Sequence, residues 1–259
     1  MQYSIGSKIN CGRFANVYTV KKDGKTYAAK VLPKHRIDIP DARNFAMINR
    51  EINNHKKVNG HPNIVKLVDV AEDWGNFYLI EEYSDKGDLA QYIDNNVPND
   101  KTIKRVLKDC LAGIIKCHDA GFIFGDLKPS NILLFENGFK LCDFGGTDTA
   151  KDMYTGSKNV RGTPVFLGPE TFVYKKEHGF IVDMWSLGML AYVMFFYRYP
   201  YDVDCTQDHL IEQILNTEIC YGGKIPADAE DFIRRCLVKD ARGRMTPREA
   251  LSHPFLVGA

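Results

Sequence analysis

Residues 125–131, with the sequence GDLKPSN, decide the fold when they are read together with Asp143-Phe144-Gly145. They supply a carboxylate at Asp126, an amine and an amide within six residues, and a second carboxylate follows twelve residues after Asn131. Residues 132–135 are apolar and lead into a Glu-Asn-Gly turn, which is the pattern of a β-hairpin. We therefore expect the three polar side chains to meet at the ends of one short hairpin.

These residue types fit the transfer of a phosphoryl group. Such a reaction needs a cradle for phosphates, a cation to neutralise them, acidic ligands for magnesium and a carboxylate beside the attacking hydroxyl. Magnesium takes few hard oxygen ligands and keeps several waters, so one carboxylate, one amide oxygen and the substrate phosphates suffice. The sequence therefore predicts a site for Mg²⁺ and substrate phosphates around Asn131 and Asp143.

Outward from this segment, the chain divides into a strand-rich first part and a helix-rich second part. In the first part, apolar patterning predicts strands at 3–9, 17–21, 25–31, 65–70 and 76–80, and one helix at 41–59. A linker at 84–88 follows. Helical patterns then cover 89–95, 103–120, 182–196, 208–215, 227–237 and 247–252. This order predicts an α+β fold with a small β-rich lobe (1–83), a larger α-helical lobe (84–259) and a ligand-binding cleft between them.

Composition excludes some classes of function. The 34 basic and 33 acidic residues give a net charge of +1, so no nucleic-acid or membrane partner is expected. Seven dispersed cysteines without zinc-ligand spacing, and no signal peptide, predict an intracellular, cytoplasmic location. The apolar run 187–196 is too short to span a bilayer and predicts a buried helix.

The motifs resemble those of the eukaryotic protein kinase family over essentially the whole chain. Residues 124–131 resemble the catalytic loop H-R-D-L-x-x-x-N, and residues 143–145 are the D-F-G. The remaining matches are residues 27–30 with V-A-I-K, Glu51 on the next helix, residues 168–170 with A-P-E and residues 183–188 with D-x-W-S-x-G. Arg244 lies where the family places the arginine that pairs with the A-P-E glutamate, here Glu170. The resemblance implies a bilobal kinase-like fold, with a protein substrate as partner and a monomeric catalytic domain.

The resemblance also implies the catalytic roles. Asp126 would orient the substrate hydroxyl and accept its proton, and Lys128 would stabilise the transferring phosphoryl group. Asn131 and Asp143 would hold magnesium, and Thr163 would contact Asp126. Lys128, two residues after Asp126, and the Gly-Thr-Pro that contains Thr163 are typical of serine/threonine kinases.

The nucleotide site follows from the same resemblance. Lys30, held by Glu51, would contact the α- and β-phosphates, and the hinge backbone at Glu82 and Ser84 would bind adenine. The other residues at the nucleotide would be Ile9, Gly12, Val17, Ala28, Glu81, Leu133 and Asp143.

The sequence departs from the family in the glycine-rich loop and before the catalytic aspartate. Only Gly12 of the three loop glycines is kept, which leaves a pseudokinase-like nucleotide-binding scaffold as the alternative to an enzyme. Gly125 replaces the arginine that pairs with a phosphorylated activation loop in many kinases, which makes this a non-RD variant. The residue that usually receives the phosphate is Asn159, so we expect activity without phosphorylation there.

Several other side chains carry predictions of their own. Phe124, Phe144, His55 and Leu67 are expected to form a hydrophobic column in which the histidine is the odd member. Glu81 takes the gatekeeper position, and such a buried carboxylate would either pair with a lysine or stay protonated. Two further residues have structural readings that we favour over reactive ones: His118 as a partner of Asp183, and Cys142 as a packing residue.

Overall fold

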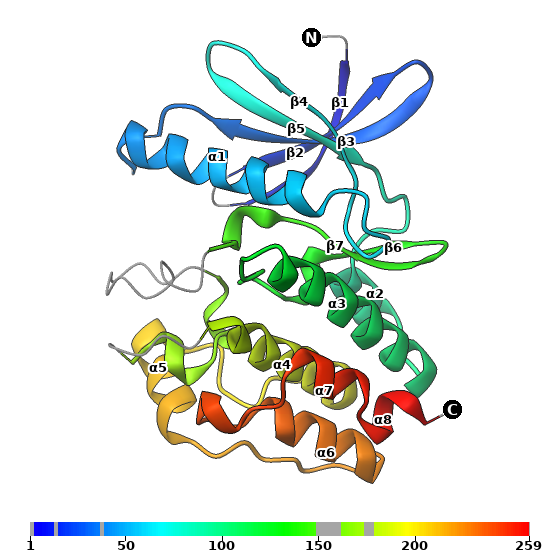
Figure 1. Cartoon of the computed structure of the whole chain (residues 1–259), viewed down its shortest axis with the longest axis vertical. Helices are drawn as coiled ribbons and strands as arrows, with labels where there is room; N and C mark the ends of the chain where they lie inside the picture. Colours follow the sequence, from blue (N-terminus) through cyan, green and yellow to red (C-terminus); the bar gives the residue numbers. More distant parts are fainter. Residues whose placement is uncertain (1–2, 13–14, 37–38, 149–161, 174–178, 259) are drawn as a thin grey trace.

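A sheet with one helix forms the upper part of the chain, and a larger helical part lies below it (Figure 1). The structure is a computed structural model that describes residues 3–12, 15–36, 39–148, 162–173 and 179–258. The boundary between the two parts falls between the last strand of the sheet, which ends at Glu82, and a helix that starts at Leu89. The predicted α+β, bilobal architecture is confirmed.

The upper part is built on a five-stranded antiparallel sheet. Its strands, in the order in which they lie side by side, are β1 (Ser4–Cys11), β2 (Asn16–Lys22), β3 (Lys25–Pro33), β5 (Asn76–Glu82) and β4 (Leu67–Glu72). The turn between β2 and β3 has positive φ at Asp23 and Gly24, 50° and 73°. This is the two-residue turn that matches the twist of a hairpin, so the strands predicted at 17–21 and 25–31 are joined as a hairpin.

Helix α1 (Asp41–Val58) lies across this sheet (Figure 1). Its Ile48 and Ile52 are buried against the sheet, in a cluster that includes Leu67 and Leu79. The same helix also buries the polar residues Asn44, Glu51, Asn54 and His55. Because buried polar groups need partners, this face of α1 has to meet polar groups of other elements.

The lower part is mostly helical. Its helices are α2 (Leu89–Asn95), α3 (Asp100–Asp119), α4 (Val182–Phe196), α5 (Gln207–Asn216), α6 (Ala227–Cys236), α7 (Pro247–Leu251) and α8 (Pro254–Val257). The stretch Gly179–Phe196 is long and apolar enough to cross a membrane, but 72% of it is buried inside the protein. Such burial is that of a core helix, as predicted from its apolar run.

A short hairpin, β6 (Ile132–Phe135) with β7 (Gly138–Leu141), joins the two parts. Leu141 exchanges backbone hydrogen bonds with the segment after α1, through Asn63 and Val65, both 2.9 Å long. Leu134 donates its N–H to the carbonyl of Gly87 in the linker, at 3.1 Å. The hairpin therefore holds the segments on either side of it at a fixed place between sheet and helices.

The predicted elements are all present, with shifted ends. Helix α3 starts three residues earlier than its apolar pattern indicates, because the Asn99 side chain accepts the N–H of Thr102 and caps the helix there. Strand β4 starts at Leu67 rather than at 65, where the Asn59 side chain bonds both backbone groups of Leu67. Helix α8 was not predicted.

Candidate active site

The catalytic-loop segment is held from below by one buried carboxylate. Asp183, at the start of α4, accepts the backbone N–H groups of Phe124 at 2.9 Å and Gly125 at 2.8 Å. It also pairs with His118 Nε2 at 2.7 Å. The structural readings of His118 and Asp183 therefore agree with the geometry. The backbone that leads to Asp126 is fixed at the N–H groups of Phe124 and of Gly125, which has φ of +79°.

Four side chains form one closed polar cluster, which we call the front cluster: Asp126, Lys128, Asn131 and Thr163. Lys128 Nζ donates to Asp126 Oδ2 at 2.9 Å and to Thr163 Oγ1 at 2.8 Å. The hydroxyl and the backbone N–H of Thr163 both donate to Asp126 Oδ1, each at 3.1 Å. Asn131 Nδ2 donates to Asp126 Oδ2 at 3.0 Å. Sequence reasoning predicted the Thr163 contact, and the structure brings all four residues together.

Two glycines that the sequence reasoning missed allow this close approach. A Cβ at Gly146 would lie 2.7 Å from the Cβ of Asp126. At Gly162, where φ is +97°, a Cβ would lie 2.9 Å from the carbonyl oxygen of Gly125. Any side chain at either position would push the segment away from Asp126. The signal in the sequence that could have indicated Gly146 is its position directly after the D-F-G.

Lys30 on β3 joins α1 to the D-F-G. Its ammonium lies 2.5 Å from Glu51 Oε1 and 2.6 Å from Asp143 Oδ1, and the residue is only 8% exposed. Burial alone would lower the pKa of Lys30, but Asp143 and Glu51 outweigh it and raise that pKa above its ordinary value. Lys30 is therefore a permanent cation, and it holds the pKa of Asp143 below its usual range against the effect of burial.

Asn131 and Asp143 fit a magnesium ion that arrives with phosphates. The amide nitrogen of Asn131 is turned toward Asp126, which assigns the amide oxygen to the opposite side. Asp143 uses Oδ1 for Lys30 and for the N–H of Gly145, and its side chain is 40% exposed. Within the described ranges no group of three or more His, Cys, Asp or Glu could hold a metal. The ion would thus depend on phosphate oxygens for its remaining ligands.

The predicted adenine site lies where β3 and β5 run side by side, with β2 next to them. Val17 on β2 pairs with Lys30, and Ala28 on β3 pairs with Glu81. In the hinge, the N–H of Glu82 already bonds the Lys66 carbonyl at 3.0 Å, so its contribution to adenine would be its carbonyl.

Side chains in the hinge form hydrogen bonds with other residues of the protein. Glu82 accepts Lys140 Nζ at 2.7 Å, and Ser84 Oγ donates to the carbonyl of Leu134. On the other side of the site, Ile9 is 44% exposed on β1, and the N–H of Gly12 bonds Ala15 O at 2.8 Å. Nucleotide binding by these residues and by Leu133 stays a prediction.

Behind Asp143 the rings of the predicted column meet. His55 stacks on Phe144 with centroids 4.4 Å apart, and Phe124 meets the same ring edge-on at 5.6 Å. His55 Nε2 donates to the Val65 carbonyl at 2.7 Å, which makes this the protonated nitrogen of a neutral ring. Leu67 packs in the cluster between α1 and the sheet.

The pair of His55 and Glu81, which we call the back pair, is buried among these rings. His55 Nδ1 lies 3.4 Å from Glu81 Oε1 and has no hydrogen-bond partner. Burial raises the pKa of Glu81 to about 8 and lowers the pKa of His55 to about 4. Of the two predicted states for Glu81, the protonated one therefore holds at neutral pH, and its nearest partner is a histidine rather than a lysine.

The family comparison agrees with this geometry. The family described as "Protein kinase domain" matches residues 3–256. The chain belongs to the protein kinase family. In this kinase domain, the family's glutamate of A-P-E is Glu170, and it forms a buried two-pronged pair with Arg244, with distances of 2.5 and 2.8 Å. The predicted partnership of these two residues is confirmed.

Curated relatives cover nearly all of this kinase domain. The chain is 32% identical to "Serine/threonine-protein kinase GRIK1" of Arabidopsis thaliana, over 97% of this chain and 65% of that protein. It is 30% identical to "Calcium-dependent protein kinase 11" of Oryza sativa subsp. japonica, over 98% and 45%. It is 27% identical to "Serine/threonine-protein kinase PLK4" of Drosophila virilis, over 100% and 33%. The chain thus spans about a third to two thirds of these relatives.

Other sequence predictions have simpler outcomes. Cys142 beside the D-F-G is half-buried, and burial raises the pKa of its thiol well above the ordinary value, which favours the packing reading. Asn159, the expected phosphate-receiving position, lies outside the described residues.

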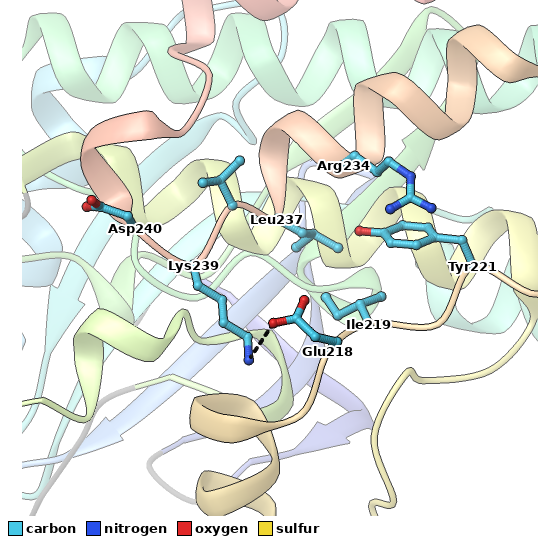
Figure 2. A pocket seen from close by; sticks show the side chains of 8 residues that line it. Glu218, Ile219, Tyr221, Arg234, Leu237, Lys239 and Asp240 are labelled. Carbon is cyan, nitrogen blue, oxygen red and sulfur yellow. Dashed lines mark ion pairs between the residues drawn. The ribbon is translucent and has the colours of Figure 1, made fainter.

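A cavity of about 390 Å³ lies elsewhere in the large lobe, between the segment after α5 and the end of α6 (Figure 2). Its lining holds two cations, Lys239 and Arg234, and two anions, Glu218 and Asp240, so its net charge is near zero. Lys239 pairs with Glu218 at 3.7 Å, and the Arg234 guanidinium stacks 3.9 Å above the Tyr221 ring. It shares no residue with the front cluster, and its charges favour no ligand of either sign.

Proposed function

We propose that this kinase domain transfers the γ-phosphoryl group of Mg²⁺-bound ATP to serine and threonine hydroxyls of protein substrates. The observation that carries the proposal is the front cluster, in which Lys128 and Thr163 both bond Asp126. It lies in one site with a buried lysine, Lys30, that bonds both Glu51 and Asp143. Positioned acid, cation and metal ligands are what phosphoryl transfer requires.

Asp126 would act on the attacking hydroxyl. Thr163 holds one of its carboxylate oxygens, and Lys128 and Asn131 hold the other. A carboxylate fixed in this way can orient the substrate hydroxyl and accept its proton as the oxygen attacks the γ-phosphorus. Lys128, which bonds Asp126, would neutralise charge on the transferring phosphoryl group. Bound magnesium would offset charge on the phosphates, and Lys30 would place them.

Two features support serine and threonine as acceptors. The lysine and threonine typical of serine/threonine kinases lie 2.8 Å apart and share Asp126 as a partner. Two of the relatives named above carry serine/threonine in their names. A protein substrate, a monomeric catalytic domain and an intracellular location stay proposals, drawn from family resemblance and composition.

The test measures phosphate transfer from labelled ATP to peptide libraries with serine, threonine or tyrosine as the only acceptor. We expect transfer to serine and threonine, and a fall of about 10²- to 10⁴-fold in Asp126→Asn. Asp119→Asn is the matched control, because Asp119 is exposed at the end of α3, where it pairs with Arg248. It should keep wild-type activity.

Two results would contradict the proposal. Transfer mainly to tyrosine would reject the acceptor class. ATP binding without any Asp126-dependent transfer would favour the scaffold alternative, for which the single glycine of the loop, Gly12, is the motivating observation. Binding is measured separately as the shift in unfolding temperature with Mg-ATP.

A further inference from the structure

An ion pair between Arg50 and Asp148 connects α1 to the segment that follows the D-F-G. Arg50 Nη1 lies 3.0 Å from Asp148 Oδ1, and the side chains are 25% and 4% exposed. We propose that this pair, together with Asn54 and Thr147, is a latch that holds α1 in place for phosphoryl transfer without any phosphate on the activation segment. The proposal rests on the proposed function and adds its regulation. We call these four residues the α1 latch.

Asp148 stands where three parts of the site meet. Its backbone exchanges hydrogen bonds with Ile123, at 2.9 and 3.3 Å. Ile123 directly precedes Phe124 and Gly125, the residues that Asp183 fixes at the catalytic loop. The backbone of Asp148 is thus tied to the catalytic loop, while its side chain is tied to α1.

A second contact of the α1 latch lies one helical turn further along α1. Asn54 Nδ2 donates to Thr147 Oγ1 at 3.1 Å, and this hydroxyl donates to the Phe144 carbonyl at 2.7 Å. Arg50 and Asn54 are four residues apart and so lie on one face of the helix. Glu51, which bonds Lys30, lies between them in sequence. A shift of α1 away from the D-F-G would break all three contacts together.

The charges explain why no phosphate is needed. Where phosphorylation orders an activation segment, an added anion gathers cationic side chains. In this chain Gly125 offers no cation, and the anion beside α1 is a permanent one, Asp148. A carboxylate that is only 4% exposed needs a charged partner, and Arg50 supplies it from α1. The protein itself therefore provides the anion that phosphorylation provides elsewhere.

The experiment compares phosphatase-treated wild type with Arg50→Gln, Asp148→Asn and the double variant. We expect each single change to lower the transfer rate at saturating ATP by about tenfold or more. The transfer rate of the double variant should be no lower than that of the less active single variant, because the two residues act as a unit. Arg50→Lys keeps the charge and should retain most of the activity. Arg43→Gln, on the exposed face of the same helix, is the matched control and should behave as wild type.

A readout other than activity separates this proposal from the function it rests on. Amide hydrogen exchange in α1 should be faster in Arg50→Gln and Asp148→Asn than in wild type and Arg43→Gln. Should the wild type show no Asp126-dependent transfer while this exchange pattern holds, the proposed function fails and the α1 latch stands.

Three results would overturn the α1 latch. These are full activity in both single variants, losses that add in the double variant, and unchanged exchange in α1. If Asp148→Asn does not fold, Thr147→Val tests the second contact, because it keeps the side-chain shape and removes the hydroxyl that Asn54 and Phe144 share. It should lower the rate about threefold, and wild-type activity in it would also count against the latch.

Discussion

The front cluster lies against Gly146, which directly follows the D-F-G, and the back pair lies against Phe144 of the D-F-G; the two groups differ in how they hold charge. In the front cluster, Lys128, Asn131 and Thr163 all bond Asp126, at 2.9 to 3.1 Å. In the back pair, a carboxyl and an imidazole are 3.4 Å apart, and His55 Nδ1 has no hydrogen-bond partner. The acidic and basic side chains of the front cluster stay charged and are paired, whereas the side chains of the back pair are neutral.

This difference separates side chains that can act on a substrate, in the front cluster, from side chains that only pack inside the protein, in the back pair. Asp126 and Lys128 keep 13% and 25% of their side chains exposed, so water and substrate can reach them. His55 is fully buried and Glu81 nearly so, and burial sets their protonation. We therefore expect changes in the front cluster to alter rate with little effect on stability, and changes in the back pair to do the reverse.

Among the residues that bond Asp126, the largest effect should come from Lys128→Ala. It removes the cation beside the transferring phosphoryl group and a donor to both Asp126 and Thr163. We expect the transfer rate at saturating ATP to fall about 10²- to 10³-fold. Lys108→Ala, at an exposed position of α3, is the control and should change neither rate nor stability. If the free energy of unfolding of Lys128→Ala fell as much as its rate, the front cluster would affect stability as the back pair does, and the expected difference between the two would be wrong.

Glu81→Gln should stabilise the protein, and more so at higher pH. The pKa of Glu81 is raised from about 4.5 to about 8, so below pH 4.5 both folded and unfolded states hold the proton. Between these pH values only the unfolded state ionises, and wild-type stability falls by up to about 1.4 kcal/mol per pH unit. Glutamine does not ionise, and its amide can still face His55.

The measurement is urea unfolding at pH 5.5, 6.5 and 7.5. The stability of Glu81→Gln relative to wild type should rise by about 2.5 kcal/mol from pH 5.5 to pH 7.5. Glu136→Gln, exposed in the β6–β7 turn, should show no such trend. A constant difference at all three pH values would mean that Glu81 ionises normally in the folded protein.

A smaller effect is expected at Thr163. Thr163→Val removes the hydroxyl that links Lys128 to Asp126, while the backbone N–H of residue 163 can still donate to Asp126. Loss of one hydrogen bond to a charged group predicts a rate about tenfold lower. Thr163→Ser keeps the hydroxyl and should stay within about twofold of wild type. Equal losses in both variants would assign the effect to packing instead.

Much of the front cluster could be predicted from sequence because its parts are close together in the chain. Asp126, Lys128 and Asn131 lie within six residues, so their meeting needs only one short loop. The periodic patterns of α1 and α4 predicted those helices for a similar reason, since helices bury residues at regular spacing. The start of α3 could not be predicted as well, because the capping Asn99 precedes the apolar pattern.

The back pair and the α1 latch could not be predicted, because their partners are distant and belong to no motif. Arg50 and Asp148 are 98 residues apart, and only the packing of α1 against the D-F-G segment brings them together. The sequence indicates that a carboxylate at Glu81 is unusual, but it does not indicate that His55 is the partner of Glu81. In the chain, His55 precedes strand β4 and Glu81 follows it. Such pairs depend on the full topology.

Gly125 has a consequence for how this kinase domain can evolve. Its φ of +79° is a conformation in which any other residue costs about 1 to 2 kcal/mol. A mutation that brought back arginine would meet this penalty, and a phosphate near α1 would still find the acidic Asp148 already paired with Arg50. Regaining control by phosphorylation would thus take at least two substitutions, with the first one disadvantageous by itself.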